Sequence, residues 1–225
     1  MIDLKHEVQE RGFQVVHIKT DSIKIPNATN EIIEFVVEFG KKYGYDFEHE
    51  TTYDWFCLVN DAVYIAREIN REGAHEYGDG GWKWTAVGAQ FQHPYVFKTL
   101  FTHEPLEFDD FCESKNIIQG SMYLEYIDGS MVHVGRTGSF VPVLDGGGTL
   151  WRIKDDKRYA VTGTKDRLWI PRDLAVSREA AGELKMDMGY FYKLREDAAD
   201  AIKQFPEAQG FDVVQALKHS WDINE

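Results

Sequence analysis

The spacing of hydrophobic residues predicts two helices near the start of the chain. Apolar side chains share one face of residues 2–11, and Gly12 is a typical helix stop. In "EIIEFVVEFGKKYG" (31–44) the apolar residues form a wide stripe, which a helix in a folded domain buries against its neighbours. Thr29 or Asn30 can cap this second helix at its N-terminus.

A β-hairpin is predicted between these two helices. Two runs rich in β-branched residues give strands over 13–18 and 22–25, which pair about the polar break "KTDS" (19–22). The hairpin would therefore present one carboxylate, Asp21, at its tip. An aspartate in a tight turn commonly stabilises the turn through its own hydrogen bonds, so the position has an ordinary explanation beside a functional one.

Further strands and short helices are predicted up to residue 113. "DFEHET" (46–51) predicts a strand, and "YDWFCLV" with "AVYIARE" predicts a hairpin about Asn60-Asp61. The polar, Gly-rich stretch 68–81 is expected to be a boundary. Beyond it the sequence predicts a strand at 82–87, a helix opening with proline at 94–101, and a helical segment at 106–113.

After Lys115 the sequence changes to short hydrophobic runs separated by Gly- and Asp-rich turns, which predicts a compact β module. Its strands are expected in "SMYLEYI", "MVHVGR", "SFVPVL", "TLWRIK", "RYAVTG" and "RLWIP". "LDGGGTL" (144–150) is interpreted as a wide hairpin turn, because a phosphate-binding loop would need a following Lys-Ser/Thr and a helix. Residues 188–205 and 211–221 are predicted to be helical.

Together these elements predict an α+β protein. The 225 residues leave room for one large domain or two small ones, and we expect three parts, 1–70, 71–116 and 117–225. No run approaches the roughly 18 apolar residues of a membrane span, and the polar N-terminus is unlike a secretory signal. Cys57 and Cys112 have no metal-site spacing, which favours a reducing, cytoplasmic setting.

The formal net charge of −13 argues against a general nucleic-acid coat. The charge is unevenly distributed, however. Residues 151–172 contain seven basic and three acidic residues, which makes this stretch the best candidate for a phosphate contact. A solvated hairpin face would produce the same composition, and on charge alone we favour that simpler interpretation.

Other polar residues give weaker signals of chemistry. The eight histidines show no HExxH spacing, and most are interpreted as ordinary surface or edge residues. Asp109-Asp110 is a carboxylate pair, but adjacent helical residues point apart, so a solvated face is expected there.

The order of elements around Asp21 changes its interpretation. An apolar strand, Thr-Asp-Ser, a second strand, a helix and then a hairpin ending in tyrosine resembles the second half of the palm of bacteriophage family B DNA polymerases. The family hairpin reads Tyr-Gly-Asp-Thr-Asp-Ser where this chain has "HIKTDS" (17–22), and the family's Lys-x-Tyr falls on "AVY" (62–64). "WKWTAVGAQF" looks like the palm-to-thumb crossing. "VHVGRTGSFVPVL" and "KRYAVTGTKDRLWI" look like C-terminal segments of some of these polymerases.

The resemblance implies Mg²⁺-dependent nucleotidyl transfer from a deoxynucleoside triphosphate onto primer–template DNA, with two cations at the site. It implies a half palm in 1–70, a thumb in 71–116 and an appended β module in 117–225. Asp21 would be catalytic and the metal ligand, Thr20 and Ser22 would hold its turn, and Tyr64 would support the primer strand. The expected DNA-contacting cations are Lys19, Lys83, Lys98, Arg152, Lys154, Lys157, Arg158, Lys165 and Arg167.

Two departures from the family pattern affect this expectation. Lys19 replaces the family's first hairpin aspartate, and Ala62 replaces the lysine of Lys-x-Tyr. The exonuclease, the fingers and the first palm aspartate cannot fit into the twenty residues before Asp21. We therefore expect a second polypeptide to carry them, in the cytoplasm of an infected bacterial host if the gene belongs to a phage. A non-catalytic DNA-binding or scaffold protein is the main alternative, and an unrelated α+β domain with a chance Thr-Asp-Ser is the third.

Overall fold

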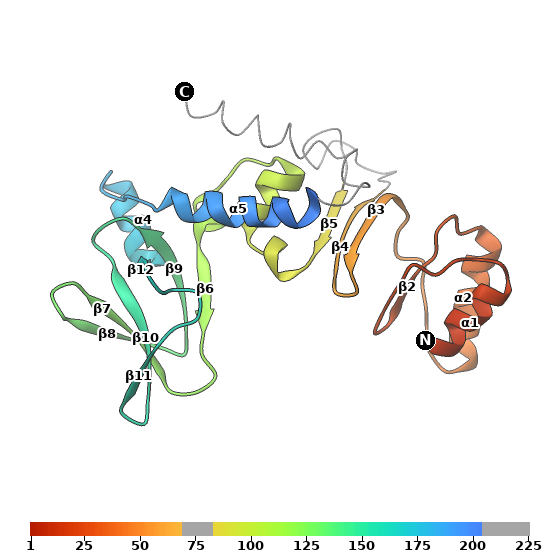
Figure 1. Ribbon diagram of the computed structural model, residues 1–225, viewed down its shortest axis with the longest axis horizontal. Helices are drawn as coiled ribbons and strands as arrows, with labels where there is room; N and C mark the ends of the chain where they lie inside the picture. The colour runs from red at the N-terminus through yellow and green to blue at the C-terminus, as the bar shows by residue number, and fades with distance from the viewer. Residues whose placement is uncertain (69–82, 204–225) are drawn as a thin grey trace. The chain divides into compact units, whose positions relative to one another are not determined.

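The structure is a computed structural model that describes residues 1–68 and 83–203 (Figure 1). These residues form two compact units, one of 1–68 with 83–87 and one of 88–203. Both units mix helices with antiparallel sheets, so the predicted α+β class is confirmed. No helix within the described ranges has the length and hydrophobicity that crossing a membrane requires.

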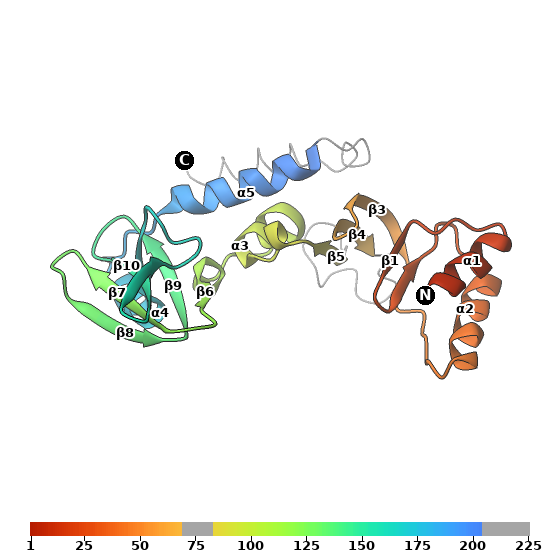
Figure 2. The same cartoon turned by 60° about the horizontal axis from the view of Figure 1, so that its bottom comes forward.

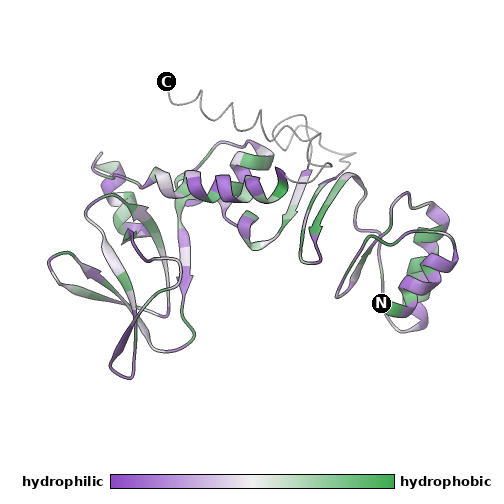
Figure 3. Cartoon of the chain, viewed as in Figure 1, coloured by the Kyte–Doolittle hydropathy of each residue, from purple (hydrophilic) through white to green (hydrophobic). Residues whose placement is uncertain are grey.

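The first unit contains two helices, a two-stranded hairpin and a three-stranded sheet. Its elements are α1 (Ile2–Glu10), β1 (His17–Lys19), β2 (Ser22–Lys24), α2 (Asn30–Lys42), β3 (Tyr53–Asn60), β4 (Val63–Glu68) and β5 (Lys83–Val87). Both predicted helices are confirmed, and hydrophobic and hydrophilic positions follow one another in bands along α2 (Figure 3). Thr29 caps α2 by accepting a hydrogen bond from the backbone N–H of Ile32 at 3.4 Å.

Leu4, Val8 and Ile32 form the centre of the helical core of this unit. Phe47 packs against the same core, although the sequence placed it in a strand over 46–51. That strand prediction is wrong, because these residues form no sheet pairing in the structure. A Cβ atom at Gly40 would lie 2.5 Å from the Phe47 ring. Because glycine has no side chain, this position of α2 leaves room for the ring.

The two hairpins of the first unit have tight turns. β1 and β2 pair as Ile18↔Ile23 and Lys19↔Ser22, which leaves Thr20 and Asp21 as the turn. The predicted first strand began earlier, at residue 13, but only 17–19 pair. β3 and β4 form the second predicted hairpin, and β5 pairs with β4. β5 was expected to lie in a thumb of residues 71–116; its ladder places 83–87 in the first unit instead. The predicted boundary loop, 68–81, lies almost entirely outside the described residues.

The second unit is built on a seven-stranded antiparallel sheet. Its strands follow the order β6-β9-β12-β10-β7-β8, and β11 also pairs with β10, along Trp151–Lys154. They are β6 (Glu113–Asn116), β7 (Ser121–Tyr126), β8 (Met131–Gly135), β9 (Thr137–Val143), β10 (Gly148–Lys154), β11 (Lys157–Ala160) and β12 (Leu168–Pro171). All six strands predicted after Lys115 are present. β6 pairs with β9, so residues expected in the thumb continue directly into this sheet.

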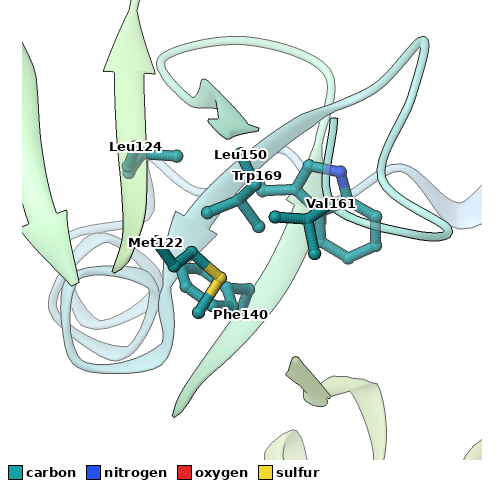
Figure 4. Packing of buried hydrophobic residues seen from close by; sticks show 6 residues of the cluster. All are labelled: Met122, Leu124, Phe140, Leu150, Val161 and Trp169. Atoms are coloured by element: carbon teal, nitrogen blue, oxygen red, sulfur yellow. The ribbon is translucent and has the colours of Figure 1, made fainter. Parts of the chain in front are cut away.

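The sheet buries side chains on both faces. On the inner face, Met122, Leu124, Phe140, Leu150, Val161 and Trp169 pack together (Figure 4). On the other face, Val141, Val143 and Ile170 pack under α4 (Arg172–Ala180). The sequence pattern did not predict α4, because this helix buries only Ala175 and has no wide apolar stripe.

The Gly-rich segment before β10 is a crossing and not the hairpin turn that the sequence predicted. β12 lies between β9 and β10, so 144–147 passes over it. Gly147 lies directly against that strand, since a Cβ atom there would approach the backbone oxygen of Trp169 to 2.9 Å. Glycine is therefore needed for close approach to another backbone, and no phosphate need be involved.

Three short helical segments and α5 complete the second unit. They are a 3-10 turn (Ala89–Phe91), α3 (Pro94–Phe97) continuing as one π-helical turn (Lys98–Thr102), and a second 3-10 turn (Phe108–Phe111). α5 (Met188–Lys203) runs beside α3 (Figure 2). The predicted helices at 94–101 and 188–205 are thus largely confirmed. The predicted helix at 211–221 lies outside the described residues.

Candidate functional site

Asp21 lies at the tip of the β1–β2 hairpin, as the sequence predicted. Lys19, Thr20 and Asp21 are exposed to solvent, and Ser22 is half-buried. The two strands fix the turn through antiparallel pairing, so the carboxylate is presented from an ordered backbone. Lys19 ends β1 directly opposite Ser22, which brings one ammonium group to the same end of the hairpin.

A buried histidine attaches this hairpin to the sheet of the first unit. His17 Nε2 donates a hydrogen bond to the backbone oxygen of Asp61 at 3.1 Å. Its ring also packs against Phe56 and Tyr64, with centroids 6.5 Å and 5.3 Å away. Most histidines were expected to be surface or edge residues, whereas His17 is only 6% exposed. The hydrophobic residues on both sides of His17 were the signal that pointed to a buried strand.

Tyr64 is part of the same packing and is only 8% exposed. Its ring stacks on Phe56 with centroids 5.2 Å apart. Burial raises the pKa of the Tyr64 hydroxyl, with the Glu50 and Glu68 carboxylates adding to the effect. In this position the ring fixes the hairpin on the sheet, and it has little surface left for the primer contact that the resemblance implies.

The oxygen ligands of a two-metal site are not all present in the described residues. Two-metal catalysis holds its ions about 3.5–4 Å apart, bridged by carboxylates. Asp21 supplies one carboxylate, and no group of three or more His, Cys, Asp or Glu side chains able to hold a metal exists within 1–68 and 83–203. The described residues alone therefore do not fit a pair of Mg²⁺ ions.

The two expected thumb lysines are both engaged with carboxylates. Lys83 Nζ lies 3.1 Å from Glu68, and Lys98 Nζ lies 2.9 Å from Asp110. The hydrogen bond to Asp110 raises the pKa of the Lys98 ammonium. Burial opposes ionisation of Glu68, but hydrogen bonds, that from Lys83 among them, outweigh it and lower the pKa of the carboxyl.

The carboxylate pair 109–110 also differs from its prediction. Asp110 is buried and accepts hydrogen bonds from Lys98 and from the backbone N–H of Glu107, so the expected solvated face is wrong for this residue. Asp109 forms a two-point ion pair with Arg172 at the start of α4, with contacts of 2.7 and 2.9 Å. The two carboxylates do point apart, as predicted, but both hold structural elements together.

The predicted basic cluster lies mostly on the β10–β11 hairpin, whose outer end is strongly hydrophilic (Figure 3). Asp155 and Asp156 form its turn with positive φ angles of 50° and 58°, as in the two-residue turns that suit a twisted hairpin. Arg152 lies over the Tyr159 ring at 4.7 Å, which places a cation and an aromatic ring on one face. Lys154 donates to Gln119.

The remaining cations of the cluster divide into exposed and paired groups. Lys157 and Lys165 are exposed. Arg158 lies 3.1 Å from Glu125 of β7 and keeps about half of its side chain exposed. Arg167 pairs with Asp187 and lies over the Tyr190 ring at 4.8 Å, so it holds the start of α5 to the loop before β12. Five of the six cations therefore lie on the β10–β11 hairpin or in the loop that follows it. The sixth, Arg167, has a structural role at the start of α5 instead.

A second polar cluster, around Glu113, contains none of the predicted site residues. Glu113 accepts hydrogen bonds from Lys115 and from the Tyr190 hydroxyl, and His93 Nε2 lies 3.7 Å away. The Glu113 and Lys115 side chains are each only 12% exposed. Burial lowers the pKa of the His93 imidazole. Burial also raises the pKa of the Tyr190 hydroxyl, and the hydrogen bond to Glu113 adds to this effect. The available signal was Glu-x-Lys on a strand, since residues two apart lie on one face.

No protein-family model matches this chain, and no match was found among curated proteins or solved structures. The comparisons identify no polymerase palm.

Proposed function

We propose that this chain is the C-terminal part of a DNA-directed DNA polymerase and supplies one metal-binding aspartate, Asp21. The observation that carries the proposal is the position of Asp21, which is exposed at the two-residue turn of a hairpin. His17 holds that hairpin on the three-stranded sheet through its hydrogen bond to Asp61 and its ring contacts. A carboxylate held in this way is suited to share a cation with ligands from another chain.

A second polypeptide is part of this proposal. It would carry the exonuclease, the fingers and the first palm aspartate, and the joined chains would bind Mg²⁺, primer–template DNA and a deoxynucleoside triphosphate. The absence of a sufficient carboxylate group from the described residues supports a site completed in this way. The lysine beside Asp21 would offset part of the negative charge of phosphates at the site.

A non-catalytic DNA-binding or scaffold protein is the second candidate. Two observations favour it: Lys19 takes the place of an expected carboxylate, and the Tyr64 ring is buried in packing. Both candidates place nucleic acid on this chain, and they differ in whether Asp21 does chemistry. The third interpretation, an unrelated domain with Thr-Asp-Ser at a turn, predicts no DNA contact.

We expect the isolated chain to show no primer extension, because its described residues offer one candidate metal-binding carboxylate where two-metal transfer needs at least two. A tagged chain, purified from its native host with its bound proteins, should extend a primer when Mg²⁺ is present. The measurement is incorporation of labelled nucleotide by the two samples. Extension by the isolated chain would contradict the divided site, and a bound complex without extension would favour the scaffold interpretation.

Contact with DNA should depend on local cations, since the whole chain is acidic. Lys157→Ala combined with Arg158→Ala should weaken binding to primer–template DNA. It should also flatten the slope of log affinity against log salt by roughly one to two units. Fluorescence anisotropy over a salt series measures both quantities. A matched control replaces Lys185 and Lys193, whose exposed side chains lie in surface ion pairs elsewhere. Equal slopes for the two double variants would exclude this hairpin from the contact.

A further inference from the structure

An aromatic row crosses the outer face of the sheet in the second unit. Register pairs Trp151 of β10 with Tyr123 of β7, and Tyr123 with His133 of β8. Paired residues in an antiparallel sheet lie on the same face, and successive residues of a strand alternate between faces. Met122 and Leu124 point into the core (Figure 4), so Tyr123 between them points outward. We call Tyr123, His133 and Trp151 the aromatic row.

Of the described helices, α4 lies on this face, but it packs on strands other than those of the aromatic row. α4 packs on β9 and β12, and α5 packs on α3 and its neighbouring turns. Figure 1 likewise shows β7, β8, β10 and β11 extending away from α4 and α5. His133 is exposed and Tyr123 and Trp151 are partly so, which is unusual for an aromatic group that serves only the core. The ring centroids of Tyr123 and His133 are 5.0 Å apart, so the two rings are in contact.

A cation lies at the edge of the aromatic row. Arg158 is paired in register with Ile153, two residues along β10 from Trp151, so it belongs to the same face. Glu125, also on this face, holds the guanidinium at 3.1 Å while about half of the Arg158 side chain stays exposed. Lys157, next to the turn, pairs with Lys154 and therefore lies on the opposite face. The row thus adjoins the one stretch of the chain in which basic residues outnumber acidic ones by seven to three.

We infer that this face binds single-stranded nucleic acid, with unpaired bases stacked on the aromatic row and the backbone phosphates near Arg158. Aromatic side chains with neighbouring cations are the combination that holds single strands without sequence preference. A duplex offers no free base faces, so the rings themselves favour an unpaired strand over paired DNA. In the setting of the proposed function, on which this identification of the ligand rests, the strand is template DNA beyond the primer.

The test uses fluorescence anisotropy of the full chain with a labelled 20-nucleotide oligothymidine and with a duplex of the same length. The single strand should bind more tightly. Tyr123→Ala and His133→Ala should each weaken its binding about fivefold or more, the lower part of the range for one base–aromatic stack. Tyr123→Phe should restore binding, because it keeps the ring. Tyr159→Ala is the matched control: Tyr159 is exposed on the same hairpin, but its pairing with Arg152 places it on the opposite face.

Circular dichroism melting of each variant separates loss of binding from loss of folding, and quenching of tryptophan fluorescence by the oligonucleotide reports contact directly. The inference is overturned if the duplex binds as tightly as the single strand. It is equally overturned if Tyr123→Ala binds like the unchanged chain, or if Tyr159→Ala is as weak as Tyr123→Ala. The assay needs no partner and no metal, so a failure here leaves primer extension by the purified complex untouched. Conversely, a complex without extension leaves the single-strand contact standing.

Discussion

Asp21→Ala should abolish primer extension by the purified complex while its thermal midpoint stays almost unchanged. The side chain is exposed at a two-residue turn, where substitutions usually change stability by less than about 0.5 kcal/mol. If the carboxylate binds a catalytic cation, its removal eliminates a ligand that alanine cannot replace. Asp21→Asn should be almost as inactive, because it keeps the shape of the side chain and removes the charge.

Asp61→Ala provides the matched control for this experiment. Asp61 is exposed in the turn of the other hairpin of the same unit, and only its backbone oxygen takes part in the contact with His17. Asp61→Ala should leave the rate of primer extension within about twofold of the unchanged complex, and Lys19→Ala should lower this rate only mildly. A rate for Asp21→Ala within about threefold of the unchanged complex, or about 0.7 kcal/mol in barrier, would rule out a metal-ligand role.

The sequence predicted the elements that depend on nearby residues. Alternation bounded by Asp- and Gly-rich turns located the strands of the second unit, since hairpin formation depends on a few adjacent positions. Thr29 and the apolar stripe after it located α2. The tip position of Asp21 followed from the same local rules, which is why the candidate residue could be named before the fold was known.

The sequence could not predict features that arise from contacts between distant segments. The insertion of β12 between β9 and β10 changes a predicted hairpin turn into a crossing, and no local signal encodes that pairing. Phe47 leaves its predicted strand because Gly40 offers it a place in the helical core. Burial of His17 and Tyr64 depends in the same way on two hairpins that pack together. Polar residues thus acquired structural roles that composition alone does not reveal.

Glu113 is the clearest case of such a hidden structural role, and its replacement should cost more stability than that of any exposed charge. Its carboxylate joins Lys115 on the same strand to Tyr190 of α5, beside His93 at the start of α3. Lys115 also lies over the Trp169 ring, at 5.0 Å from its centroid. The cluster therefore connects the sheet to both helices of this part of the unit.

Glu113→Ala should lower the free energy of unfolding by about 3 kcal/mol, the lower end for removing one partner of a buried ion pair. The substitution leaves the Lys115 charge without its carboxylate and the Tyr190 hydroxyl without its acceptor in a largely buried position. Glu113→Gln should cost less, since its amide oxygen can still accept the Tyr190 hydrogen bond. The control is Asp197→Ala, which breaks an exposed pair with Lys193 on α5 and should cost about 0.3–0.5 kcal/mol.

Urea denaturation measures the stability of each variant, and hydrogen exchange locates the change. The amides of β6 and α5 should lose protection first in Glu113→Ala, because the cluster joins these elements, while those of the first unit should keep theirs. A loss no larger than that of Asp197→Ala would mean that solvent reaches the cluster and screens its charges. A loss spread evenly over both units would instead show that the two unfold as one, and that the cluster has no local role in holding α5 to the sheet.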